Sequence, residues 1–247
     1  MAIDDARVGN YQEGPSFMFS QGLFTESSTQ RHRLGTIRTL DDGRVFAYAL
    51  AGEALYAGKI TQGPAPTSNH NTQAIYAAAA VGDKRVYVTL GATAAAANLY
   101  KDGWLCINDA TYGAEFYKVR GHAAIGSAES GYIDLYDTVR VAITTSSTYT
   151  LLKNIQCGVV AGTSTNTAAP AGVPLIDVTN AYYFWNQVKG PCSILTSGTL
   201  VIGNTCIIVD TGAVGPNSAD VDCNVGSVIS VSATTLYSII NLQIPGY

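Results

Sequence analysis

The chain has 247 residues, of which 47% are hydrophobic and only 13% are charged, with a formal net charge of −4. This length can hold one large β domain or two smaller ones, each with its own core. The charged share is about half that of an average soluble domain. We therefore expect either that partners cover much of the surface or that Ser, Thr and Asn keep it soluble. The excess of acidic over basic side chains argues against nucleic-acid binding, which needs a clustered positive surface.

Charge is unevenly distributed along the chain. Residues 1–150 carry 26 charged side chains and residues 151–247 carry six. Those six are Lys153, Asp177, Lys189, Asp210, Asp220 and Asp222. This shift in composition indicates two structural halves. The 25 glycines and the many Ser and Thr residues favour strands and turns over helices.

Features of targeting are not evident. Met1 leads directly into a polar, acidic stretch, so no signal peptide is expected, and no apolar run approaches the roughly 18 residues of a membrane span. The cysteines are odd in number, widely spaced and without a C-x-x-C motif. We expect buried free thiols in a protein made in a reducing cytoplasm. The cysteines are Cys106, Cys157, Cys192, Cys206 and Cys223.

The first 33 residues show neither helical nor strand periodicity. A disordered terminus and an extended arm that becomes ordered on a neighbour both fit this pattern. The arm is favoured because three phenylalanines and a methionine fall within eight residues. The anchors expected to contact a neighbouring molecule are Phe17, Met18, Phe19 and Phe24.

Short strand-like runs begin near Leu34. Residues 84–90 illustrate the pattern, with Val86 and Val88 alternating around Tyr87. Other runs in the first half are 35–40, 44–50, 54–60, 74–80, 103–109, 115–119, 132–145 and 148–152. A single helical turn is predicted at 94–100, where alanines raise helix propensity.

The second half of the chain also consists of short strand-like runs. Its runs are 154–161, 174–178, 181–191, 199–203, 205–210, 225–233 and 236–244. The alternation in the last run, 236–244, predicts that Ser238, Ile240 and Leu242 lie on the same face of a strand as Leu236 and Ile244. Strands spaced 8–12 residues apart are typical of small barrels and sandwiches. The sequence thus predicts an all-β protein: an extended arm (1–33), a sandwich or tulip-like domain (34–152) and a C-terminal β-barrel-like domain (153–247).

The sequence contains no motif that indicates enzyme chemistry. His32, His70 and His122 have no neighbours at metal-ligand spacing and are expected on the surface or in loops. The sequence contains neither a nucleophile elbow nor a phosphate loop. We therefore predict no catalytic, cofactor-binding or metal-binding residues and expect a protein that is not an enzyme.

Two groupings of acidic residues are candidate sites. Asp134 and Asp137 should point to opposite faces of a strand end and are read as solvated acids. A loop rich in acids offers oxygen ligands suited to calcium, but its spacing fits no EF-hand and its residues are ordinary turn formers. The loop residues concerned are Asp210, Asn217, Asp220 and Asp222.

The run Tyr182–Trp185 is the most conspicuous aromatic cluster. On a strand, Tyr182 and Phe184 would face one way, and Tyr183 and Trp185 the other. We interpret one side as core and the other as a protein interface, in preference to a platform for sugars or bases.

Several stretches resemble the capsid decoration, or head cement, proteins of tailed bacteriophages. The quoted motifs are RVFAYALAGEALYAGKI, NLYKDGWLCINDATYGAEFYKVRGHAA, AITTSSTYTLLKNIQCGVV and the W-x-Q-x-x-G-P strand at Trp185, Gln187, Gly190 and Pro191, in this order from about residue 35 to the C-terminus. The resemblance implies a protein on the virion exterior that binds the major capsid protein, commonly as a homotrimer. A phage adhesin binding host glycans and a hydrolase of unrecognised type remain alternatives.

Overall fold

The computed structural model describes residues 20–109, 113–165, 167–217 and 223–247. Within these ranges the regular structure consists of β-strands and one 3₁₀ turn, η2 (Ser68–His70). The prediction of an all-β protein with two β modules is therefore confirmed. None of the described helical structure is long and apolar enough to cross a membrane.

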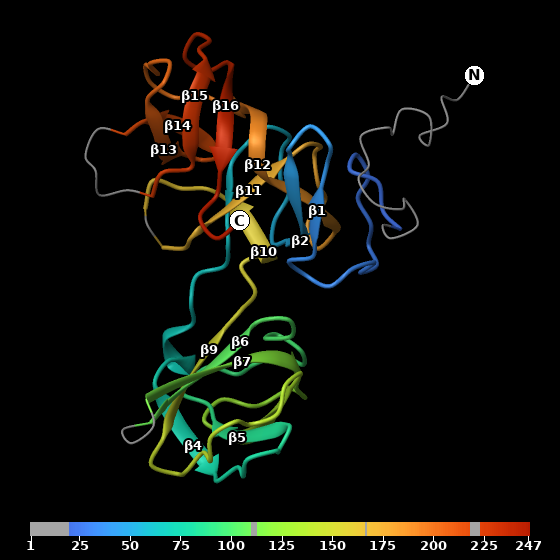
Figure 1. Ribbon diagram of the computed structural model, residues 1–247, viewed down its shortest axis with the longest axis vertical. Coiled ribbons are helices and arrows are strands. Elements are labelled where there is room, and N and C mark those ends of the chain that lie inside the picture. Colours follow the sequence, from blue (N-terminus) through green and yellow to red (C-terminus); the bar gives the residue numbers. More distant parts are fainter. Residues whose placement is uncertain (1–19, 110–112, 166, 218–222) are drawn as a thin grey trace. The chain divides into compact units, whose positions relative to one another are not determined.

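The chain forms two compact units, and one is inserted into the other. Residues 65–154 form one unit, while the other combines the N-terminal residues up to 64 with residues 155–247 (Figure 1). The predicted domains 34–152 and 153–247 therefore need correction. The reason is that β2 (Val45–Ala51) pairs with β12 (Tyr183–Leu195), which places an early strand in the C-terminal sheet.

The inserted unit is a closed six-stranded barrel with the strand order β4-β5-β8-β7-β6-β9. Its strands are β4 (Gln73–Ala77), β5 (Arg85–Thr89), β6 (Trp104–Asp109), β7 (Gly113–Gly121), β8 (Ser130–Leu135) and β9 (Thr148–Leu152). Closure leaves no sheet edge exposed. The alternation predicted around Tyr87 is confirmed, since Val86 and Val88 are fully buried and Tyr87 is exposed.

The helical turn predicted at 94–100 is wrong. Ala95 instead forms an isolated β-bridge with Ile125. Asn98 and Asp102 then adopt positive φ angles of 61° and 60°, which ends any helical path. Four alanines are too short a run to nucleate a helix against these tertiary contacts.

The second unit contains a ten-stranded sheet in the order β1-β2-β10-β3-β11-β12-β16-β15-β13-β14. The strands not yet defined are β1 (Ile37–Thr39), β3 (Thr61–Gln62), β10 (Cys157–Ala161), β11 (Pro170–Pro174), β13 (Thr205–Asp210), β14 (Ala213–Pro216), β15 (Gly226–Ser230) and β16 (Tyr237–Gln243). Because β2 also pairs with β12, the five strands β2-β10-β3-β11-β12 close into a ring.

The strands beyond β12 close in a similar way. An isolated bridge between Thr196 and Val214 ties β14 back to the chain leaving β12. Residues 153–247 therefore do not form the predicted C-terminal barrel by themselves. The first ring also needs β2 and β3, which come from the N-terminal part of the chain. The run 199–203, predicted as a strand, is a turn instead, with Val201 and Ile202 exposed.

Strand β12 is shared by both rings and changes partner within its length. It pairs with β2 up to Lys189 and with β16 from Lys189 onward. Gly190 has a φ of +91° at this point. The Gln187 Nε2 group donates to the carbonyl oxygens of Lys189, Gly190 and Pro191 at 3.1, 3.3 and 3.0 Å. The Gln and the Gly of the W-x-Q-x-x-G-P motif thus shape the bend at which one ring passes into the other.

Both faces of β2 are buried, which explains its nearly continuous apolar sequence. Ala47 and Ala49 point into the apolar core, while Phe46 and Tyr48 join a second cluster on the opposite face. We call this second group the aromatic cluster; its buried members are Leu34, Leu40, Phe46, Tyr48 and Trp185.

The last strand largely follows its predicted pattern. Ser238, Ile240 and Leu242 are fully buried, and Tyr237 and Ile239 are exposed. Only Leu236, which precedes the strand, departs from the prediction because it is 54% exposed.

Candidate interaction site

Residues 20–34, which we call the anchor segment, pack on the aromatic cluster of their own chain. Gln21 is the principal anchor and is only 5% exposed. Its Oε1 accepts from the Tyr48 hydroxyl at 2.6 Å, and its Nε2 donates to the Tyr183 carbonyl at 2.8 Å. Its carbonyl accepts from Trp185 Nε1 at 3.0 Å and from Arg38 at 3.3 Å. One residue thus ties the segment to β2, β12 and β1.

Further contacts hold the middle of the anchor segment. Ser27 and Tyr183 exchange two backbone hydrogen bonds of 3.0 and 2.8 Å, as in an antiparallel pair. The Glu26 carboxylate accepts from the Thr179 amide at 2.6 Å and from its hydroxyl at 2.9 Å. Hydrogen bonds to a charged acceptor are the stronger kind. The chain from residue 21 to residue 27 is therefore fixed to the sheet at several points.

The aromatic cluster beneath the segment is closely packed. The ring of Tyr48 stacks on Tyr183 with centroids 5.9 Å apart and meets Trp185 edge-on at 5.1 Å. His32 of the anchor segment lies against both Tyr48 and Trp185, at 5.1 and 5.4 Å. Burial and the neighbouring Arg38 lower the pKa of His32, so the imidazole is neutral in this setting.

The strand alternation predicted for Tyr182–Trp185 is observed. Phe184 packs in a core cluster with Tyr182, whereas Trp185 and Tyr183 belong to the aromatic cluster. The side predicted as a protein interface is covered here by the anchor segment of the same chain. The sequence did not single out Gln21, because a lone glutamine between a serine and a glycine carries no recognisable signal.

Of the predicted arm anchors, only Phe24 is among the described residues. It is 65% exposed on the fixed anchor segment. Phe17, Met18 and Phe19 lie outside the described residues, directly before the start of that segment.

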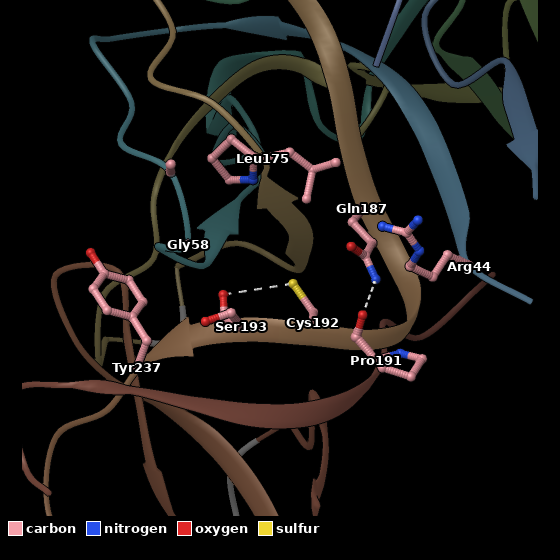
Figure 2. Close-up of a pocket in the computed structure, with 10 residues that line it drawn as sticks. Arg44, Gly58, Leu175, Gln187, Pro191, Cys192, Ser193 and Tyr237 are labelled. Atoms are coloured by element: carbon pink, nitrogen blue, oxygen red, sulfur yellow. Dashed lines mark hydrogen bonds between the residues drawn. The ribbon is translucent and has the colours of Figure 1, made fainter. Parts of the chain in front are cut away.

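A pocket of about 480 Å³ lies in the same unit (Figure 2). It is lined by Arg44, Ala57, Gly58, Pro174, Leu175, Gln187, Pro191, Cys192, Ser193 and Tyr237. Leu175 also packs against the aromatic cluster, so the pocket borders that cluster.

The walls of this pocket are mostly apolar. Figure 2 shows Tyr237 and Gly58 on one side and Gln187 and Arg44 on the other, with β12 beneath. A Cβ on Gly58, whose φ is +70°, would lie 2.6 Å from the Tyr237 ring, so this close approach requires glycine. Burial raises the pKa of the Cys192 thiol to about 12, so this cysteine is unreactive at neutral pH.

Several exposed apolar side chains lie on and next to β15 and β16. Ile229, Val231, Tyr237 and Ile239 are each 43–45% exposed. No side chain that the structure describes after Lys189 is charged; the acids of this stretch are Asp210, Asp220 and Asp222, whose side chains are not described. Exposed apolar side chains that gather on neighbouring strands are typical of interaction sites.

A second exposed apolar area lies on the barrel wall formed by β9, β6 and β7. Trp104 stacks on Phe116 with ring centroids 4.6 Å apart and planes 16° from parallel. The Lys118 ammonium lies 4.4 Å from the centroid of the Trp104 ring, a cation–π contact. Phe116 and Leu152 on this wall are 49% and 41% exposed.

All three histidines lie outside the β-strands, which agrees with the expected surface or loop positions, but His70 and His122 are buried. His70 Nε2 donates to the Thr93 carbonyl at 2.7 Å, and its Nδ1 contacts the Tyr100 hydroxyl. His122 Nδ1 donates to the Ala123 carbonyl at 2.7 Å, and its Nε2 accepts from the Tyr100 amide at 3.2 Å. Both imidazoles are thus used as structural hydrogen-bonding groups of the barrel unit.

Acidification should destabilise the barrel unit through His122. Burial lowers the pKa of His122 below the ordinary 6.5 and outweighs the opposite effect of the hydrogen bond to the Ala123 carbonyl. Because the unfolded chain binds this proton first, stability is complete above about pH 6.5 and is lost as the pH falls toward the folded-state pKa. Protonated Nε2 can no longer accept from the Tyr100 amide, a loss on the order of 1 kcal/mol. Urea unfolding of the wild type and of His122→Gln between pH 5 and 7 checks this; an equal pH dependence in both proteins would contradict it.

The two acidic groupings noted in the sequence lie partly within the described residues. Asp134 is half-buried and pairs with Arg85 at 2.9 Å, while Asp137 is exposed. Among the described residues no group of three or more His, Cys, Asp or Glu could hold a metal ion. Most of the acidic loop considered for calcium lies outside the described residues, and Asn217 there donates to Asn224 at 2.8 Å.

All five cysteines are free thiols. Cys192 and Cys206 are buried as expected, but Cys106 and Cys157 are only partly buried, and Cys223 is exposed.

Comparison with protein families, curated proteins and solved structures finds no match to this chain.

Proposed function

We propose that this protein is a virion structural protein of a tailed bacteriophage that binds the outer surface of the capsid and cements adjoining subunits of the major capsid protein. It would be made in the host cytoplasm, act as a homotrimer and catalyse no reaction. The ordered motifs that resemble head cement proteins support this proposal. The structural observation that carries it is the exposed apolar surface on both units, with no charged side chain described beyond Lys189.

Cementing is an adhesive function, so it needs buried area more than reactive groups. A stable protein interface buries roughly 1,600 Å² in total, and aromatic residues usually contribute most of the binding energy. The face around β15 and β16 and the Trp104–Phe116 wall both offer such residues. Several contact areas on one chain suit a protein that must bridge neighbouring subunits.

Deletion of the N-terminal arm tests this proposal. Residues 1–19, with Phe17 and Phe19, precede a segment that Gln21 fixes to the sheet. Deleting residues 1–19 should weaken binding to expanded empty heads by tenfold or more, because each aromatic anchor in an interface contributes about 2 kcal/mol or more. Co-sedimentation of full-length and truncated protein with heads over a concentration series measures this.

Two outcomes would count against these ideas in different ways. Equal occupancy of heads by the full-length and the truncated protein would show that the arm does not contribute to the interface, but it would not contradict the cementing function. A full-length protein that never binds heads would contradict the proposed function itself.

A second candidate is a phage adhesin that binds host surface glycans. The stacked, partly exposed Trp104–Phe116 pair favours it, because sugars pack against flat aromatic faces. A glycan array with the full chain and with Trp104→Ala distinguishes the two functions. Glycan binding that disappears in the variant would favour the adhesin.

A further inference from the structure

The outer wall of the barrel unit carries tyrosines on three neighbouring strands. Tyr87 of β5 lies directly opposite Tyr132 of β8. On its other side β5 pairs with β4, where Tyr76 points away from the barrel core. Tyr76 and Tyr87 are 61% and 38% exposed, and Tyr132 is half-buried. Because paired strands lie about 4.8 Å apart, the three side chains are neighbours on one strip of the wall.

Two arginines border this strip. Arg85 lies opposite Asp134 in the register of β5 and β8, and its Nε donates to the Asp134 carboxylate at 2.9 Å. The Arg85 guanidinium also lies over the Tyr132 ring, 3.8 Å from the ring centroid. Arg120 of β7 approaches the same carboxylate to 3.9 Å. The side chains of Arg85 and Arg120 are 44% and 57% exposed. We call these residues the tyrosine face: Tyr76, Tyr87, Tyr132, Arg85 and Arg120.

Arg85 is held in place without using all of its donors. Its contact with the Tyr132 ring and the bond from Nε orient the plane of the guanidinium. Less side-chain entropy is therefore lost when this group binds a partner. Neither terminal nitrogen of Arg85 has a hydrogen-bond partner among the residues that the structure describes. These two nitrogens form an edge that can bind a carboxylate in a bidentate way.

The charge of this wall is positive. The outward positions of β5, β8 and β7 carry three cations, Arg85, Lys118 and Arg120, and one acid, Asp134. Two copies of the same face would repel each other, whereas a surface with carboxylates complements it. Tyr and Arg are also among the residue types that contribute most to binding in protein interfaces. The composition of the face therefore favours an acidic protein surface as its partner.

We propose that the tyrosine face binds an acidic segment of a partner protein. Arg85 and Arg120 hold Asp or Glu carboxylates of that segment, and the tyrosine rings pack against the residues between them. The inference rests on the proposed function and names the chemistry of the capsid surface that the barrel unit contacts. The three tyrosines lie on β4, β5 and β8, apart from the Trp104–Phe116 pair on β6 and β7.

Co-sedimentation with expanded empty heads tests the role of the free guanidinium edge. Arg85→Gln should weaken binding by tenfold or more, because it removes a charge and both terminal donors. Arg140→Gln is the matched control. Arg140 also pairs with a carboxylate, Glu115 at 2.8 Å, and lies over a tyrosine ring, Tyr117 at 4.7 Å. However, Tyr117 is fully buried, and Arg140 Nη2 already donates to the Phe116 carbonyl at 3.1 Å. This control should bind as the wild type does.

A second variant separates the aromatic contribution from the charge. Tyr87→Ala removes an exposed ring from the centre of the face and should also weaken binding by tenfold or more. Its effect should persist at high salt. The effect of Arg85→Gln should diminish as NaCl is raised toward about 1 M, where the Debye length falls to about 3 Å. Thermal unfolding of each variant verifies that it folds.

The outcomes separate this inference from the proposed function. A wild-type protein that never binds heads would contradict the proposed function and this inference with it. Wild-type binding together with equal affinities of the Arg85→Gln and Arg140→Gln variants would overturn the inference alone. Binding to acidic glycans that is lost in Arg85→Gln, with unchanged binding to heads, would also overturn it and would identify an acidic sugar as the ligand of this face.

Discussion

Replacing Trp185 by Ala is expected to lower the free energy of unfolding of the ten-stranded unit by about 3–5 kcal/mol, the usual cost of removing a fully buried tryptophan. Trp185 is 1% exposed, lies against Tyr48 and donates its indole N–H to Gln21. The substitution therefore leaves a cavity and also removes a support of the anchor segment. We expect residues 20–34 to become sensitive to proteases before the sheet unfolds.

Hydrogen exchange measured peptide by peptide tests this effect, and the barrel unit of the same chain serves as the internal reference. Peptides from β2 and β16 should lose protection, while peptides from β5 and β6 of the barrel unit should keep theirs. Phe24→Ala is the matched control, because that side chain is exposed and its removal should change stability by less than about 0.5 kcal/mol. Equal loss of protection in both units would contradict the separation of the chain into two units.

Gly190→Ala is expected to destabilise the same unit by about 2–4 kcal/mol. The φ of +91° at Gly190 is costly for a residue with a Cβ, by about 1–3 kcal/mol. An added Cβ would also lie 3.0 Å from Cγ and 3.1 Å from Cα of Arg44, and the Cα belongs to the backbone and cannot rotate away. The bend of β12 and the Arg44 side of the pocket should both be disturbed.

Gly203→Ala separates these two contributions. Gly203 has a similar φ of +86°, but a Cβ there would meet no atom within 4 Å. Its substitution should cost only the conformational part, about 1–2 kcal/mol. Urea unfolding curves of the two variants give the comparison; if Gly203→Ala costs as much as Gly190→Ala, the contact with Arg44 has no effect.

Local patterns predicted much of the strand content, because alternation is a property of neighbouring residues. The runs at 84–90 and 148–152 correspond closely to β5 and β9, and Ile240 and Leu242 are buried as their alternation requires. The strand predicted at 199–203 is wrong because Val201 and Ile202 are apolar but lie in an exposed turn.

The unit boundaries could not be predicted from these patterns. They depend on which strands pair, and the pairing of β2 with β12 joins residues more than 130 positions apart. The candidate site was predicted in part for the same reason. The aromatic run at Tyr182–Trp185 is visible in the sequence, but its partner Gln21 is identified only by long-range hydrogen bonds.

The insertion of one unit into the other has a consequence for the order of folding. All six barrel strands lie within residues 65–154, so the barrel can close as soon as this stretch has left the ribosome. Strand β2 leaves earlier but must wait for β10 and β12, which are made later. Until then β2 has only β1 as a partner, and its apolar residues, Phe46 and Tyr48 among them, have no complete sheet to join. We therefore expect the barrel to fold early and the long-range pairing with β12 to be the late step that completes the molecule.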